Sequence, residues 1–308
     1  MVAPMVKVSH VAFRAWVRSY TPEPIRPLLF TEMLSTRRIP SQHLDEAQFL
    51  RTYPGEPAFI PQLLGNEEKF IVPSVQKLSA LSPWGFDINM GCPSKKTLSH
   101  NWGVLLMGDK KYAADVVRVT KRACSVPVSV KMRAGIGEKV DLDYLLQFTE
   151  AIEEAGADWM TLHCRTKVQR HTGVPHWEVF SAVAKERSIP VVANGDIQTA
   201  EDAIRVMTEF GADGAMIARA ATVRPWILWQ IAHRLGLLGE GAPLPPLTRE
   251  EEGSEYFRSL YRLCGLLEQF FTDEERPLDK LKVIVGISHR WLLFGHAFWL
   301  KLNRTQSL

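Results

Sequence analysis

Short apolar runs of strand length recur along the first two thirds of the chain. The predicted strands cover residues 2–5, 27–33, 59–65, 86–91, 127–134, 159–164, 190–196 and 214–219. Several runs are almost entirely apolar, which is typical of parallel strands buried on both faces. Helix-length amphipathic segments separate most of them, as at 109–123, 141–155 and 199–210. This alternation predicts parallel βαβ units, and their number without an evident reversal of strand order favours a closed (β/α)8 TIM barrel.

The pattern changes after residue 237. A stretch rich in Gly and Pro at 239–248 predicts a linker, and two helices are expected after it, over 250–271 and 279–304. The second helix mixes aromatic side chains with basic ones, so this part is either a cap on the barrel or part of a nucleic-acid surface. We therefore expect a barrel domain over 1–237 and a small helical domain over 238–308.

Composition and charge narrow the class of protein. A hydrophobic content of 46% supports a sizeable core, and a net charge of +3 permits a polyanionic partner without requiring one. The four cysteines show no CxxC or Cys/His ligand spacing, which argues against a disulfide framework or a zinc site. Charged and polar residues interrupt the most apolar late stretch, 283–300, and the start lacks a signal-peptide profile. We expect a cytoplasmic monomer without a metal or a membrane anchor.

Polar or reactive side chains lie at the carboxyl ends of six predicted strands. They are Gln62, Asn89, Cys92, Lys131, Arg133, His163, Arg165, Asn194, Asp196 and Arg219. In parallel barrels the strand ends and the loops after them converge, and active sites are built there. The repeated placement therefore predicts one site at this end of the barrel.

The segment 87–96 is expected to present a thiol. Gly91 permits a sharp turn after the strand and Pro93 restrains the backbone after Cys92, so the thiol should face the barrel mouth. There it could act as a nucleophile or as a proton donor. Lys131, at the end of the next strand, is either a Schiff-base former or a fixed positive charge for an anionic ligand.

A phosphate site is expected after the last two predicted strands. Asn194-Gly195-Asp196 and Ala218-Arg219-Ala220 lie where barrels commonly hold phosphate with backbone N–H groups and an arginine. The sequence therefore predicts a phosphorylated cofactor or substrate.

These motifs, in this order, resemble one family. The segments are Ala3-Pro4-Met5, Gln62-Leu-Leu-Gly, Asn89-Met-Gly-Cys-Pro-Ser-Lys-Lys, Gly103-Val-Leu-Leu, Val130-Lys-Met-Arg, His163-Cys-Arg-Thr-Lys, Asn194-Gly-Asp-Ile and Met216-Ile-Ala-Arg. Together they resemble the tRNA-dihydrouridine synthases of the bacterial, flavin-dependent type. The resemblance runs from residue 3 to about residue 225.

The resemblance implies an enzyme that uses FMN and NADPH to reduce the C5–C6 double bond of specific uridines in tRNA. Reduced FMN would give a hydride to C6, and Cys92 would give a proton to C5. The implied FMN contacts are Pro4, Met5, Gln62, Lys131, His163, Asn194, Gly195, Asp196, Ala218 and Arg219. The implied substrate contacts are Asn89, Lys95, Arg133, Arg165 and Lys167. The helical tail would be the tRNA-binding domain.

Other functions stay open at this point. An FMN-dependent dehydrogenase acting on free pyrimidines, of the dihydroorotate or dihydropyrimidine type, would share the fold and a strand-end cysteine. A Schiff-base aldolase or a phosphate-binding lyase could use Lys131. An RNA-binding protein without catalysis is the third alternative. Ala218 and Ala220 flank Arg219, where the family more often has glycines beside the arginine, which predicts weaker FMN retention.

Overall fold

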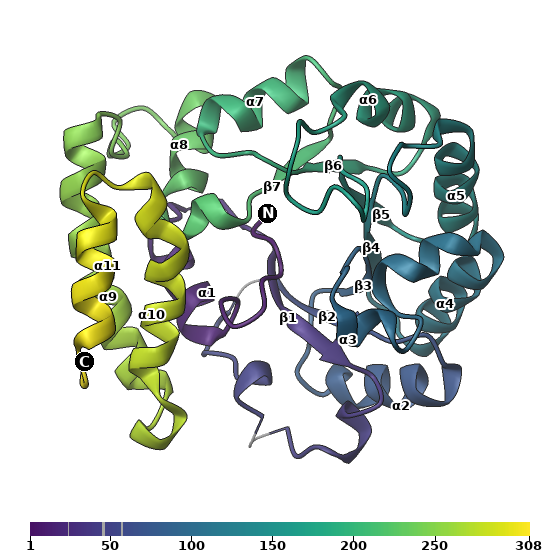
Figure 1. Cartoon of the computed structure of the whole chain (residues 1–308), viewed down its shortest axis with the longest axis horizontal. Helices are drawn as coiled ribbons and strands as arrows, with labels where there is room; N and C mark the ends of the chain where they lie inside the picture. Colours follow the sequence, from purple (N-terminus) through teal and green to yellow (C-terminus); the bar gives the residue numbers. More distant parts are fainter. Residues whose placement is uncertain (24, 45–46, 57) are drawn as a thin grey trace.

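Seven parallel strands form one curled sheet in which neighbours in sequence are neighbours in space. The computed structural model describes residues 1–23, 25–44, 47–56 and 58–308. The strands are β1 (Leu29–Ser35), β2 (Phe59–Leu64), β3 (Phe86–Met90), β4 (Val128–Arg133), β5 (Trp159–His163), β6 (Val191–Asn194) and β7 (Gly214–Met216). Figure 1 shows them around a common centre with helices outside them, so the predicted barrel architecture is confirmed.

The eighth position of the barrel is held by a single residue. Val2 forms a parallel bridge to Leu29 of β1 and another to Ile217, just after β7, which closes the sheet. The strand predicted over 2–5 is therefore wrong in its extent. Pro4 has no N–H with which to continue the ladder, and the chain then turns, with the N–H of Val8 bonded to the Met5 carbonyl at 3.1 Å.

Helices cover the outer face of the sheet. They are α1 (Val11–Ser19), α2 (Glu68–Ser79), α4 (Lys110–Ala123), α5 (Leu142–Glu154), α6 (Trp177–Glu186), α7 (Ala200–Thr208) and α8 (Ile227–Arg234). The short α3 (Lys95–Leu98) lies instead in the loop that follows β3, at the mouth of the barrel (Figure 1). Three predicted helices, α4, α5 and α7, begin where expected. Each follows a side-chain cap, Asp109, Asp141 or Thr199, whose oxygen accepts from a backbone N–H in the first turn.

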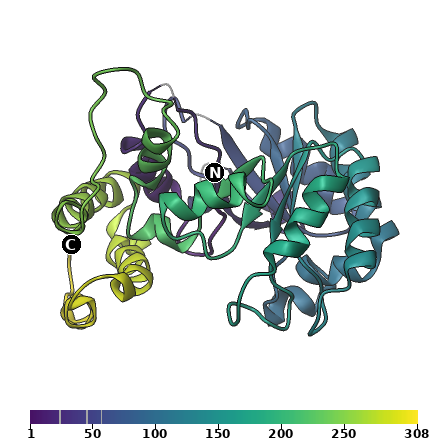
Figure 2. The same cartoon turned by 90° about the horizontal axis from the view of Figure 1, so that it is seen from above.

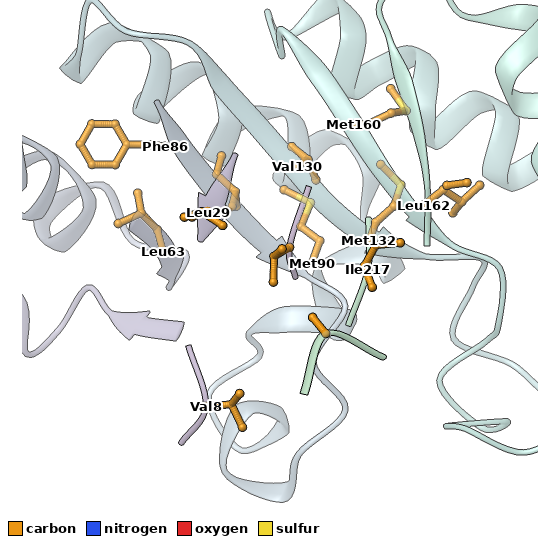
Figure 3. Packing of buried hydrophobic residues seen from close by; sticks show 14 of the residues in the cluster. Val8, Leu29, Leu63, Phe86, Met90, Val130, Met132, Met160, Leu162 and Ile217 are labelled. Atoms are coloured by element: carbon orange, nitrogen blue, oxygen red, sulfur yellow. The ribbon is translucent and has the colours of Figure 1, made fainter. Parts of the chain in front are cut away.

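Side-chain alternation along the strands divides the interior in two. Val130 and Met132 of β4 and Leu162 of β5 point outward into the layer between sheet and helices (Figure 3). The alternate residues of each strand point into the barrel instead. There a second, small apolar cluster includes Ile60 and Trp159. The polar residues of the site lie above that cluster, at the carboxyl ends of the strands.

The C-terminal part contains three helices, α9 (Arg249–Phe270), α10 (Pro277–Ser288) and α11 (Gly295–Arg304). The single helix predicted over 279–304 is wrong, because the chain turns between α10 and α11. Phe294 has a left-handed φ of 57°, and at Gly295 a Cβ would lie 2.0 Å from the His289 carbonyl oxygen. This close approach lets α11 fold back against α10 (Figure 1).

The C-terminal helices are joined to the barrel by buried contacts. Trp16 of α1 donates from Nε1 to the Ser259 carbonyl at 2.7 Å, and the Tyr20 hydroxyl donates to Glu255 at 2.6 Å. Leu263 and Ile284, both fully buried, belong to the same core cluster as the barrel helices. Figure 2 shows these helices (yellow) at one end of the molecule, with α4 and α5 at the other. In the described part of the chain, no helix is long and apolar enough to span a membrane.

Candidate functional site

One cavity, of about 350 Å³, opens at the carboxyl ends of the strands. Its lining includes most of the side chains singled out in the sequence. They are Pro4, Met5, Gln62, Asn89, Cys92, Lys131, Arg133, His163, Asn194, Gly195, Asp196, Ala218 and Arg219. The sheet order explains the gathering, because consecutive parallel strands bring their ends to one rim.

The turn after β3 holds Cys92 half-buried at the cavity wall. Oδ1 of Asn89 accepts from the backbone N–H groups of Gly91 and Cys92, at 3.1 and 2.9 Å. Oγ1 of Thr97 lies 3.4 Å from Sγ of Cys92 and donates to it. At Gly103, whose φ is 60°, a Cβ would lie 2.7 Å from the Cys92 carbonyl oxygen. The backbone of Cys92 is therefore held by Asn89 and packed closely against Gly103, while its thiol contacts Thr97; the sequence did not reveal the contacts of Thr97 and Gly103.

Lys131 lies partly buried in the cavity floor beside a carboxylate that sequence reasoning missed. Its Nζ donates to Oδ1 of Asn194 at 3.0 Å, and Nδ2 of Asn194 donates to the Met216 carbonyl at 2.8 Å. Burial lowers the pKa of Lys131 to about 8, and burial raises the pKa of Asp87 to about 6. The attraction between the opposite charges of Lys131 and Asp87 partly offsets the effect of burial on each pKa. Asp87 lies within an apolar run, so only the sheet register shows that it faces the barrel interior.

His163 ends β5 with one ring nitrogen unpaired. Among the described residues, Nδ1 is buried without a hydrogen-bond partner. Burial, together with the charges of Lys131, Arg133 and Arg165, lowers its pKa to about 2. The ring is therefore neutral near pH 7. A neutral imidazole at a cavity wall can make one further hydrogen bond to a ligand.

The loops after β6 and β7 join through Asp196. Oδ1 of Asp196 accepts from Arg219 at 3.3 Å, and the other carboxylate oxygen accepts from Arg165. Gly195 has a φ of 118°, and a Cβ there would lie 3.4 Å from Nε2 of His163. The side chain of Arg219 is 43% exposed, so it retains donors for an anion at the rim.

Three predicted substrate contacts lie outside the lining. Arg165 is only 1% exposed, and besides Asp196 it donates to the carbonyls of Thr172 and Gly173. Lys95 is exposed on α3, and Lys167 lies on the loop after β5. The cavity itself therefore gathers Asn89 and Arg133 of the predicted substrate set but not these three.

Arg133 ties two loops together at the cavity edge. It donates to the Gly91 carbonyl at 2.9 Å, to the Thr166 carbonyl at 3.0 Å and to the Arg170 carbonyl at 2.9 Å. These bonds connect the Cys92 turn to the loop after β5. The position of Arg133 is thus set by backbone acceptors on both sides of the cavity.

The C-terminal helices supply part of the wall. Ile287 of α10 and Trp291, just after it, line the cavity together with His171 of the loop after β5. Nothing local in the sequence places α10 against the barrel mouth, since the contact depends on tertiary packing. Within the described ranges, no group of three His, Cys, Asp or Glu side chains is placed to hold a metal ion.

Comparison with known proteins gives one consistent result. A family model described as dihydrouridine synthase matches residues 1–274. A probable tRNA-dihydrouridine synthase 1 of Synechocystis sp. is 34% identical over 233 residues, which are 75% of this chain and 63% of that protein. A tRNA-dihydrouridine synthase B of Pseudomonas aeruginosa is 32% identical over 80% of this chain and 72% of its own. The corresponding protein of Pseudomonas syringae pv. tomato is 31% identical over 89% and 77%.

Proposed function

The chain belongs to the dihydrouridine synthase family, and on that basis we propose that it reduces specific uridines of tRNA to 5,6-dihydrouridine, with FMN bound and NADPH as reductant. One observation carries the proposal. A thiol and an amine, both half-buried, and a neutral histidine line the same cavity, in Cys92, Lys131 and His163. This set suits a cofactor held on one side of a base and a proton donor on another.

The cavity residues fit a flavin mononucleotide. A volume of about 350 Å³ is within the range of small-molecule sites. The unpaired Nδ1 of His163 and the charge of Lys131 suit polar edges of a ring, and Arg219 with the backbone after Gly195 suits a phosphate. Pro4, Met5, Gln62, Asn194, Asp196 and Ala218 would complete the contacts. When bound, FMN supplies the hydride.

Cys92 would supply the proton. Saturating C5–C6 requires one proton at C5, and the thiol of Cys92 would give it from the cavity wall, where the Thr97 hydroxyl contacts Sγ. Asn89 and Arg133, on either side of the turn, would orient the pyrimidine. A uridine must leave its stack to reach this depth, so contacts with neighbouring phosphates are needed. Lys95 and Lys167 are proposed for that role, with Arg165 holding the loop that carries Lys167.

We assign catalysis to residues 1–237 and tRNA contact to residues 238–308. The support is that Ile287 and Trp291 reach the cavity wall, so the helical part borders the place where a base would enter. Arg290, Lys301 and Arg304 lie exposed on the same part and could contact phosphates.

The test is conversion of tRNA that lacks dihydrouridine. Protein, FMN and NADPH are incubated with this tRNA, and dihydrouridine is mapped by mass spectrometry. Product at defined positions is expected, and Cys92→Ala is expected to lose most of the turnover. Well-folded, FMN-loaded protein that leaves tRNA unchanged but turns over free uracil or dihydroorotate would reject the proposal.

A further inference from the structure

A chain of side-chain hydrogen bonds lies beneath the cavity and ends at the turn that carries the thiol. Oδ2 of Asp87 accepts from Nε2 of Gln62 at 2.6 Å. Oε1 of Gln62 accepts from Nδ2 of Asn89 at 2.9 Å. Oδ1 of Asn89 accepts from the N–H groups of Gly91 and Cys92 at 3.1 and 2.9 Å. Two side chains, Gln62 and Asn89, therefore connect the buried carboxylate of Asp87 to the backbone of the candidate acid.

The sheet register puts these groups at one level. Gln62 of β2 pairs with Asp87 of β3, and Asp87 pairs with Ser129 of β4. All three are fully buried, and Oγ of Ser129 donates to Oδ1 of Asp87 at 2.6 Å. Hydrogen bonds that water does not reach are strong, and an unmatched group among them is costly. The arrangement thus has little freedom to change.

The carboxylate imposes a direction on the chain. An ionised carboxylate only accepts hydrogen bonds, so Gln62 must turn its Nε2 toward Asp87. This leaves Oε1 of Gln62 for Asn89, which must then present Oδ1 to the backbone. At the far end, the N–H groups of Gly91 and Cys92 need an acceptor and favour the same order. The two ends therefore select one orientation of both amides.

Burial raises the pKa of Asp87 to about 6, and the hydrogen bonds from Ser129 and Gln62, together with the charge of Lys131, oppose that rise. The resulting pKa of Asp87, about 6, is below neutral pH. The acceptor-only form of Asp87 is therefore the main form near pH 7.

We propose that Asp87 is a positioning residue for the proton donor. By holding Gln62 and Asn89 in one amide orientation, it holds the backbone of Gly91 and Cys92, and hence Sγ, at a constant place on the cavity wall. The importance of this for catalysis rests on the proposed function. The hydrogen-bond chain itself is independent of the proposed function.

The experiment is amide hydrogen exchange at Gly91 and Cys92, resolved by fragmentation mass spectrometry. Asp87→Asn keeps the size of the side chain but offers a donor as well as an acceptor, so this end no longer imposes a direction. Exchange at the two amides is expected to rise about twofold to tenfold, the effect of weakening one hydrogen bond. Exchange in β5 and β6 is expected to stay unchanged.

Ser129→Ala is the matched control. It removes a bond of the same 2.6 Å length to the same carboxylate but leaves the links to Gln62 and Asn89. Because the Ser129 hydrogen bond also favours the charged form of Asp87, the comparison is made well above neutral pH, where exchange at Gly91 and Cys92 in Ser129→Ala should stay close to that of the wild type. A positioning role also predicts that Asp87→Asn lowers kcat for tRNA at an unchanged KM.

Two outcomes would overturn the proposal: wild-type exchange at Gly91 and Cys92 in Asp87→Asn, or an equal rise throughout β5 and β6. If Asp87→Asn does not fold, Gln62→Met removes the middle link while Asp87 keeps its bond to Ser129. The same local rise is then expected, and its absence rejects the idea. Failure of the wild type to reduce uridine would reject the proposed function alone, since the exchange experiment needs no turnover.

Discussion

Trp291 and Gln198 meet across the edge of the candidate site. Nε1 of Trp291, at the end of the α10 segment, donates to Oε1 of Gln198 in the loop after β6 at 3.3 Å, and both side chains line the cavity. The residues are 93 positions apart in sequence. The wall of the cavity is therefore completed by a part of the chain that follows the barrel.

Replacing Trp291 separates its two contributions. Trp291→Ala opens the wall and is expected to speed dissociation of FMN, because buried apolar area is lost. Trp291→Phe keeps most of that area and loses only the bond to Gln198, so a smaller effect is expected. Stopped-flow dilution followed by flavin fluorescence measures both rates. Equal rates in the wild type and Trp291→Ala would show that this wall does not contact the cofactor.

Replacing Cys92 tests the proton donor. Cys92→Ala is expected to lower single-turnover reduction of tRNA by about 10²-fold to 10⁴-fold, the usual contribution of a positioned acid. FMN content and tRNA affinity should stay near wild type, because the side chain is small. Cys264→Ala, on α9 and away from the cavity, is the control. Undiminished reduction by Cys92→Ala would contradict the assignment.

Replacing Arg219 tests the phosphate site. Arg219→Gln removes a charge-assisted donor, which is worth about 1.5–3 kcal/mol, so the Kd for FMN should rise roughly tenfold to a hundredfold. Riboflavin, which lacks the phosphate, should bind the wild type and the variant alike. Arg234→Gln is the control, since Arg234 pairs with Glu201 in an exposed ion pair outside the cavity. A riboflavin affinity that falls as much as that of FMN would argue against a phosphate contact.

Replacing Gly195 tests the backbone beside His163. At a φ of 118° an added side chain is strained, and its Cβ would lie 3.4 Å from Nε2 of the histidine. Gly195→Ala should reduce the free energy of unfolding by about 1–3 kcal/mol. Gly239→Ala is the matched control, because nothing lies within 4 Å of a Cβ there. Denaturant titration of both variants measures the difference. Similar unfolding midpoints for Gly195→Ala and Gly239→Ala would contradict the expected strain at residue 195.

Stability should fall with acid because of buried neutral histidines. Burial, then the charges of Lys280 and Arg14, lowers the pKa of His10 to about 3. Between about pH 6.5 and pH 3 the unfolded chain therefore binds a proton that the folded chain does not. Above about pH 6.5 the free energy of unfolding does not change with the titration of this group. Between about pH 6.5 and pH 3 it falls by up to about 1.4 kcal/mol per pH unit for each such group. His163 acts in the same direction.

His10→Asn isolates one of these groups. Nδ1 of His10 caps α1 by accepting from the Phe13 N–H at 3.3 Å, and asparagine can replace that cap without titrating. Urea unfolding near pH 7 and near pH 5 should show a smaller loss of stability on acidification in the variant. An identical loss would mean that His10 is not the titrating group.

The sequence alone determined the architecture and the position of the site. The apolar runs predicted the strands and the amphipathic segments at 109–123, 141–155 and 199–210 predicted helices, because both patterns depend on residues close in the chain. The structure adds that Asp109, Asp141 and Thr199 cap these helices. Placement of polar residues at strand ends was enough to predict that Cys92, Lys131 and His163 share a cavity, since parallel strands in order bring their ends together.

Only the tertiary structure decided which side chains meet. Sheet register sets the bridge at Val2 and the hydrogen-bond partners of Asp87. Arg165 lies outside the cavity lining because its side chain donates to carbonyl groups of a loop. The turn between α10 and α11 and the contact of Trp291 with Gln198 depend on packing between two parts of the chain. Such contacts leave no periodic pattern, because they join residues whose spacing is set by the fold and not by a helix or a strand.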